Sequence, residues 1–189
     1  MSDTTMRRKD RAIDDKQWIM DLLYRAPVGV FATVHDGRPF TVARNFAYDE
    51  EKHAIYMHGA RKGRTFSNVS EDGLVCINVS EVGRMFPDAR AMNFGIEYNG
   101  VVIFGKTSLV TDNDEAKRGL QLLIDKHFSH LTPDVDYEST TDTDLKITAV
   151  YRVDITAWSG KQKITAQDHP GAFYEDKGNK RIVPYKRNK

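Results

Sequence analysis

The sequence predicts a small antiparallel β-barrel with a few helices. Short runs of aliphatic and aromatic residues follow one another closely, and turn signals such as Asp36-Gly37 join them. This spacing is typical of strands linked by hairpins. With 189 residues, 40% of them hydrophobic, the chain is long enough for one domain with a sizeable core. We expect a flexible N-terminal segment, the barrel domain and a basic C-terminal tail over residues 1–12, 13–165 and 166–189.

Each element follows from the local pattern. Strands are expected over residues 28–34, 39–48, 54–58, 73–79, 97–110 and 148–157. A first helix, with apolar residues on one face, ends at Pro27, because the residue before a proline avoids helical geometry. Further helices are expected from Thr65 to Glu71 and after Asp112, which can cap the helix. Residues 83–93 and 129–144 show no clean period and are expected to be long connections.

Charge and composition exclude some classes of function. The chain has 28 Lys and Arg against 27 Asp and Glu, so we expect no general attraction to nucleic acid. The single cysteine, Cys76, lies in an apolar run and is expected in the core of a protein from a reducing compartment. The sequence has neither an apolar run of about 20 residues for a bilayer nor a signal-peptide pattern. We therefore expect a cytoplasmic protein without a membrane partner.

The most informative stretch is residues 54–69, where an apolar strand enters a basic turn that continues as a helix. The turn carries the cations Arg61, Lys62 and Arg64, together with two glycines. Backbone N–H groups, a helix N-terminus and cationic side chains all favour negative charge. The stretch is therefore a candidate phosphate site. From these residues alone, a solvated basic turn without a ligand is the alternative.

Three histidines raise the question of chemistry. His58 stands where the strand enters the turn, so it could hold a ligand or donate a proton to a substrate, or it could simply be a hydrogen-bonded histidine. His127 and His130 are three residues apart near a helix end. Because a third ligand is not evident, we expect them to interact with the helix C-terminus and predict no metal site.

Several motifs occur in a fixed order along the chain. Ala43-Arg44-Asn45-Phe46 precedes the stretch Tyr56–Arg64, which is followed by Tyr98–Lys106 and Trp158–Lys161. This order resembles the FMN-binding split-barrel superfamily, which includes pyridoxamine 5′-phosphate oxidase. The His-Gly-Ala-Arg-x-Gly-Arg form of the turn is most similar to the nitroimidazole-resistance (Nim-type) flavin-binding branch. The resemblance covers residues 13–162 and implies a split antiparallel β-barrel.

The resemblance also implies a homodimer with FMN at the subunit interface. Arg44 matches a residue that reaches the flavin and its phosphate, and Arg61 and Lys62 match the phosphate-binding pair. Tyr98 to Gly100 match a segment from the other subunit. Trp158 is either a packing residue or a stacking partner of the flavin. The implied cofactor-binding residues are Arg44, Asn45, Phe46, Met57, His58, Ala60, Arg61, Lys62, Arg64, Tyr98, Asn99, Gly100, Trp158 and Lys161.

The sequence also departs from the oxidases. Residues 47–49 lack their strand lysine, and the C-terminal substrate pattern with Arg and His is not found, so vitamin B6 oxidation is not expected. We expect an FMN-dependent oxidoreductase that passes electrons from a reduced nicotinamide to a small flat acceptor, with His58 as the candidate catalytic residue. Two alternatives stay open: a non-catalytic flavin-binding protein for storage or redox sensing, and a nucleic-acid-binding module.

Overall fold

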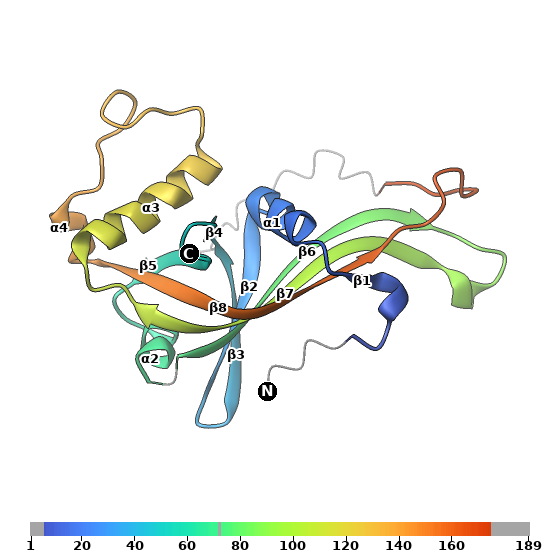
Figure 1. Cartoon of the computed structure of the whole chain (residues 1–189), viewed down its shortest axis with the longest axis horizontal. Helices are drawn as coiled ribbons and strands as arrows, with labels where there is room; N and C mark the ends of the chain where they lie inside the picture. Colours follow the sequence, from blue (N-terminus) through green and yellow to red (C-terminus); the bar gives the residue numbers. More distant parts are fainter. Residues whose placement is uncertain (1–5, 72, 175–189) are drawn as a thin grey trace, which may run out of the picture.

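The computed structural model describes residues 6–71 and 73–174, which form a split antiparallel β-barrel (Figure 1). The strand order is β3-β2-β6-β7-β8-β5-β4, and β1 pairs with β8. The strands are β1 (Ala12–Ile13), β2 (Val28–His35), β3 (Arg38–Asn45), β4 (Ala47–Asp49), β5 (Ala54–Ala60), β6 (Leu74–Phe86), β7 (Gly95–Leu109) and β8 (Thr148–Lys163). The helices are α1 (Lys16–Arg25), α2 (Arg64–Glu71), α3 (Asn113–His127) and α4 (Asp142–Leu145), with 3-10 turns η1 (Lys9–Arg11) and η2 (Ala91–Asn93). The predicted fold class is confirmed.

The sheet curls. One continuous segment of the chain supplies the edge strands at both ends of the strand order. The predicted strand over residues 39–48 is divided at Phe46: β3 pairs with β2, whereas β4 pairs with β5. The two strands are therefore at opposite ends of the strand order although one residue separates them. Phe46 is 1% exposed and lies in the core. The division at Phe46 is what brings β3 next to the end of β5.

Two strands extend well beyond their predicted ends. Residues 83–86 belong to β6 rather than to a connection, and β8 continues past residue 157 to Lys163. A register shift between Val82 and Met85 interrupts the alternation of side chains along β6. The periodicity of the sequence therefore does not reveal the end of this strand. Figure 1 shows β6 and β7 leaving the barrel as a long curved pair. We call this extension, with the paired end of β8, the arm.

The core lies between the sheet and α1. The side chain of Asp15 caps α1 by accepting hydrogen bonds from the backbone N–H groups of Gln17 and Trp18, and Ile19, Leu22 and Leu23 of the helix are buried. A second cluster joins α3 and α4 to β5. α4 falls across the end of the predicted connection 129–144 and extends to Leu145. Within the described residues, no helix is long and apolar enough to span a membrane.

Cys76 is not the core residue that the sequence predicts. Its strand neighbours Val75 and Ile77 are buried, whereas Cys76 is half-buried on the opposite face. The reason is strand geometry, because successive side chains point to opposite faces.

The predicted terminal segments are partly described. In the first, Ala12 pairs with Lys161 of β8. In the second, Phe173 forms an isolated bridge with Met85. Most of the predicted basic tail, residues 175–189, lies outside the described residues.

Candidate functional site

Arg44 joins three elements at the predicted phosphate site. From β3, its Nη1 donates to the carbonyl oxygen of His58 at 2.8 Å and its Nη2 to Oγ1 of Thr65 at 2.9 Å. The first bond reaches β5 and the second reaches α2. A Cβ at position 59 would lie 3.0 Å from this Nη1, so Gly59 leaves room for the guanidinium. Nε of Arg44 is buried without a hydrogen-bond partner in the described part of the chain.

The basic turn next to Arg44 presents its cations to solvent. Arg61, Lys62 and Arg64 are exposed, and Gly63 has a φ of +94°, a conformation that side chains rarely adopt. Arg61 is anchored through Nη1, which donates to the backbone oxygens of Leu145 at 3.2 Å and Thr148 at 3.4 Å. Its other guanidinium nitrogens stay available to a ligand. We call residues 61–64, with Arg44 and His58, the near region.

His58 is exposed at the end of β5. The pKa of its imidazole is lowered, first because surrounding protein atoms take water from the ring and second because Arg44 is positively charged. A neutral imidazole at pH 7 suits hydrogen bonding better than proton donation. Met57, the preceding residue, is 1% exposed, so it can offer a ligand only its backbone, and Phe46 is equally restricted. Asn45 and Ala60 are exposed.

The second group of predicted residues lies on the arm. Tyr98, Asn99 and Gly100 of β7 pair with residues 163, 162 and 161 of β8. Nζ of Lys161 lies 5.8 Å from the centre of the Tyr98 ring. Burial alone would raise the pKa of Tyr98, but the hydrogen bond from Arg11 and the charge of Lys161 lower it. A cavity of about 530 Å³ is lined by residues 98–100 and Lys161.

The near region and the arm do not meet within one chain. On β8, Val150 is opposite His58 and Lys161 is opposite Gly100, so eleven residues separate the two groups. Extended backbone of that length spans up to roughly 36 Å. Trp158 lies between them. Its ring centre is 4.6 Å from that of His53 and 5.9 Å from that of Tyr48, which supports packing as its role within one chain.

Sequence reasoning missed two residues that contact Arg44 of the near region. Thr65 fixes Arg44, and the ring of Tyr151 lies under it, with 5.6 Å from the guanidinium carbon to the ring centre. The Tyr151 hydroxyl donates to the carbonyl oxygen of Ala60 at 3.4 Å. No local signal in the sequence indicates the contact between Tyr151 and Arg44, because Tyr151 is 107 residues after Arg44. In its own strand, Tyr151 has the pattern of an ordinary core residue.

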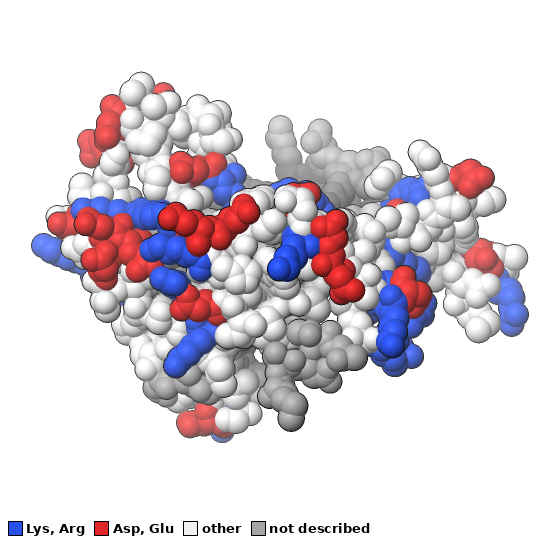
Figure 2. Space-filling model, viewed as in Figure 1, with Lys and Arg blue, Asp and Glu red and all other residues white. Residues whose placement is uncertain are grey.

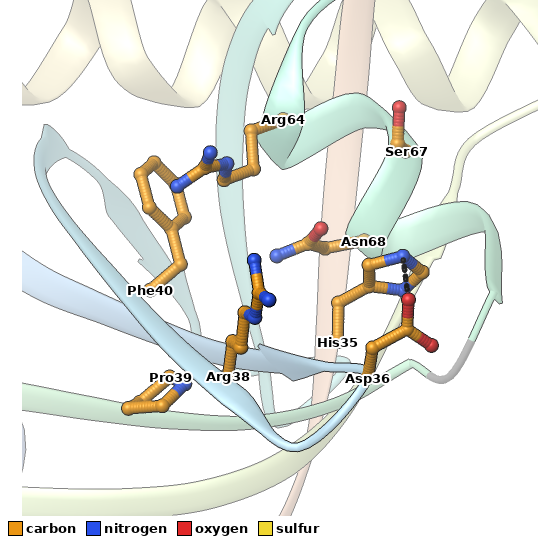
Figure 3. A pocket seen from close by; sticks show the side chains of 8 residues that line it. All are labelled: His35, Asp36, Arg38, Pro39, Phe40, Arg64, Ser67 and Asn68. Atoms are coloured by element: carbon orange, nitrogen blue, oxygen red, sulfur yellow. Dashed lines mark ion pairs between the residues drawn. The ribbon is translucent and has the colours of Figure 1, made fainter.

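A second cavity adjoins the turn. It has a volume of about 500 Å³ and lies between the β2–β3 hairpin and α2, with Arg64 on its wall (Figure 3).

The histidines near the end of α3 are not grouped with further metal ligands. Nε2 of His127 is buried and has no hydrogen-bond partner in the described residues, whereas His130 is exposed. Residues 6–71 and 73–174 contain no group of three or more His, Cys, Asp or Glu that could hold a metal ion.

Comparison with known proteins places these features in a family. The family model for pyridoxamine 5′-phosphate oxidase matches residues 15–162. None of the curated proteins is significantly similar to the chain in sequence.

Solved structures share the fold at low sequence identity. A candidate 5-nitroimidazole antibiotic resistance protein from Bacteroides thetaiotaomicron is 20% identical, with a TM-score of 0.66 over 80% of this chain and 86% of that one. An FAD- and heme-binding protein from Mycobacterium smegmatis is 20% identical, with a TM-score of 0.73 over 82% and 74%. An FAD-binding protein from Mesorhizobium loti is 19% identical, with a TM-score of 0.58 over 82% and 98%.

Proposed function

Because the chain belongs to the pyridoxamine 5′-phosphate oxidase family of flavin-binding split barrels, we propose that it is an FMN-dependent oxidoreductase. It takes electrons from a reduced nicotinamide and passes them to a small flat acceptor such as a nitroaromatic or a quinone. One observation carries this proposal: Arg44 ties the end of β5 to α2 beside three exposed cations.

The donor groups around the turn suit the phosphate of FMN. Arg61, Lys62 and Arg64 would hold it, since charge-assisted hydrogen bonds from such groups are the strong ones. The backbone at Asn45 would run along the flavin ring. Bound FMN supplies the electron chemistry, while the protein binds and orients it. His58, neutral at pH 7, would hold the cofactor through a hydrogen bond rather than act as the acid.

A second copy of the chain completes the proposed site. The outer face of β2 and β6 carries large apolar side chains that are 41–66% exposed: Val28, Val30, Val34, Leu74 and Val82. In a homodimer this face is covered, and the partner's arm supplies the residues that one chain holds far from its own near region. The single half-buried thiol is in keeping with a protein of the reducing cytoplasm.

Charge gives little support to the nucleic-acid alternative. Lys and Arg alternate with Asp and Glu across the face seen in Figure 2 instead of forming a basic stripe. Ion pairs among the described residues include Arg152 with Glu115 at 3.0 Å and Arg25 with Glu81 at 2.9 Å.

A spectrum and a coupled assay test the proposal. The purified protein should be yellow or should take up FMN with quenching of flavin fluorescence, and it should consume NADH or NADPH steadily when a nitroaromatic or quinone is added. Failure to bind FMN would contradict the proposal. Binding without turnover would instead favour the storage or redox-sensing alternative.

A further inference from the structure

The cavity between the β2–β3 hairpin and α2 gathers positive charge that no described residue neutralises. Arg38 points into it from the hairpin and Arg64 from the start of α2 (Figure 3). Neither guanidinium forms a hydrogen bond or ion pair with a described residue; Arg64 lies over the ring of Phe40, 5.2 Å from its centre. Two like charges facing one hollow repel each other, so a bound anion would stabilise the arrangement.

The negative charge on the cavity wall lies to one side. Among the described lining residues, only Asp36 carries a carboxylate, and its Oδ2 lies 3.4 Å from Nε2 of His35 (Figure 3). The wall opposite is formed by Phe40 and the two arginines. The guanidinium groups and the carboxylate therefore face the cavity from different sides.

A buried amide on the same wall offers a hydrogen bond. Asn68 is 3% exposed, and its Nδ2 donates to Oγ1 of Thr33 at 2.7 Å. Its Oδ1 accepts no hydrogen bond from the described residues, and the side chain points from α2 toward the cavity (Figure 3). With the Phe40 ring and a volume of about 500 Å³, the cavity has room for a flat polar ring as well as an anion.

The position of the cavity suggests which anion belongs there. Phe40, Val42 and Arg44 alternate on one face of β3, so the cavity is about 13 Å along the strand from Arg44, on the side away from Asn45. In the proposed function the flavin ring lies at Asn45 and its phosphate at the basic turn. The cavity therefore continues the cofactor path beyond the phosphate.

We propose that this cavity is a nucleotide subsite, in which Arg38 and Arg64 bind the phosphate of an adenylate group and its adenine packs against Phe40. The proposal rests on the proposed function for the direction of the cofactor. The adenylate could belong to a flavin dinucleotide or to the reduced nicotinamide dinucleotide, since both carry the same group. Arginine forks and aromatic rings are the usual partners of phosphates and bases.

Calorimetric titration of the full chain with ADP tests the subsite without any assay of activity. The wild type should bind ADP, and Arg38→Ala should weaken this binding at least about tenfold because it removes charge-assisted hydrogen bonds. Arg38 is exposed and makes no side-chain hydrogen bond with described residues, so the variant should fold. Arg90→Ala is the matched control, because Arg90 is an exposed arginine far from the cavity on the η2 connection.

Flavin titrations identify the source of the adenylate. FAD that binds more tightly than FMN, with only the FAD affinity reduced in Arg38→Ala, would assign the subsite to a flavin dinucleotide. Equal FAD and FMN affinities beside Arg38-dependent ADP binding would assign it to the nicotinamide dinucleotide. Absence of ADP binding, or ADP binding unchanged in Arg38→Ala, would overturn the proposal. Absence of flavin binding would contradict the proposed function, while the ADP titration would still decide on the subsite.

Discussion

The near region and the arm both carry residues that the sequence assigns to one flavin site, yet they differ in whether their charged side chains are paired. On the arm, Arg84 and Glu97 pair at 2.8 Å, and Thr165 adds a backbone hydrogen bond to the same carboxylate. These bonds hold the pKa of Glu97 at about 2. In the near region, Arg61 and Lys62 have no acidic partner among the described residues.

The difference separates scaffold from binding surface. A paired carboxylate and guanidinium are already satisfied, so the Arg84–Glu97 pair can fix the end of the arm but has little left to offer a ligand. Cations kept apart from acids cost stability through mutual repulsion and remain available to an anion. In the homodimer that we propose, each chain thus holds two incomplete halves of a site, one suited to phosphate and one suited to complete the partner's site.

The largest effect is expected from a substitution at the proposed dimer interface, because the arm can complete a site only in a second chain. Val30, 41% exposed on the outer face of β2, should be buried between two copies, so Val30→Asp should abolish the dimer by burying a charge. Light scattering should give twice 21.5 kDa for the wild type and 21.5 kDa for the variant, with loss of FMN binding.

Val135→Asp is the matched control, since Val135 is 80% exposed on the connection after α3 and should tolerate the charge. A wild-type mass of 21.5 kDa at micromolar concentration would contradict the dimer and leave the arm without a partner site.

A smaller but still large effect is expected at the turn. Replacing Arg61 and Lys62 together by Ala should weaken FMN binding at least tenfold, because each charge-assisted hydrogen bond contributes about 1.5–3 kcal/mol. Fluorescence quenching measures the affinity, and a thermal melt checks the fold, since Arg61 also holds two backbone oxygens. The double variant Lys16→Ala with Arg90→Ala removes the same charge elsewhere. Unchanged FMN affinity in the turn variant would refute the phosphate assignment.

The smallest effect is expected for His58. If it only holds the cofactor, His58→Ala should lower FMN affinity roughly fivefold, the equivalent of about 1 kcal/mol, and saturating FMN should restore the rate. A rate that stays low at saturating FMN would instead assign His58 the catalytic role.

A pH series sharpens this test. The pKa of His58 is lowered in the folded protein, so below the ordinary value of 6.5 the unfolded state takes up the proton more readily. Wild-type stability should therefore fall as the pH drops below 6.5, and His58→Ala should lack part of that loss. His127, whose pKa is also lowered, contributes to the pH dependence of both proteins. Thermal melts between pH 5 and 8 check this, and identical pH profiles would contradict the partial desolvation of the His58 ring.

Local signals in the sequence determined much of the fold. Asp36 and Gly37 both adopt positive φ, 50° and 69°, as a two-residue hairpin turn requires, and Asp112 caps α3 with its side chain. The cations of the basic turn were likewise visible, because strand, glycines and helix are contiguous. Such features depend on neighbours within a few residues, so the sequence alone is enough to predict them.

Tertiary structure decided the features that depend on distant partners. Phe46 divides a strand that reads as continuous, because its two halves pair with different strands. Thr65 and Tyr151 hold Arg44 only once β3, β5, β8 and α2 have come together. The cavity that we propose as an adenylate subsite also forms only when distant elements come together, since Arg38 and Asn68 come from a hairpin and a helix thirty residues apart. Strand pairing is set by hydrogen bonds between segments far apart in the chain, and no periodicity within one segment can report it.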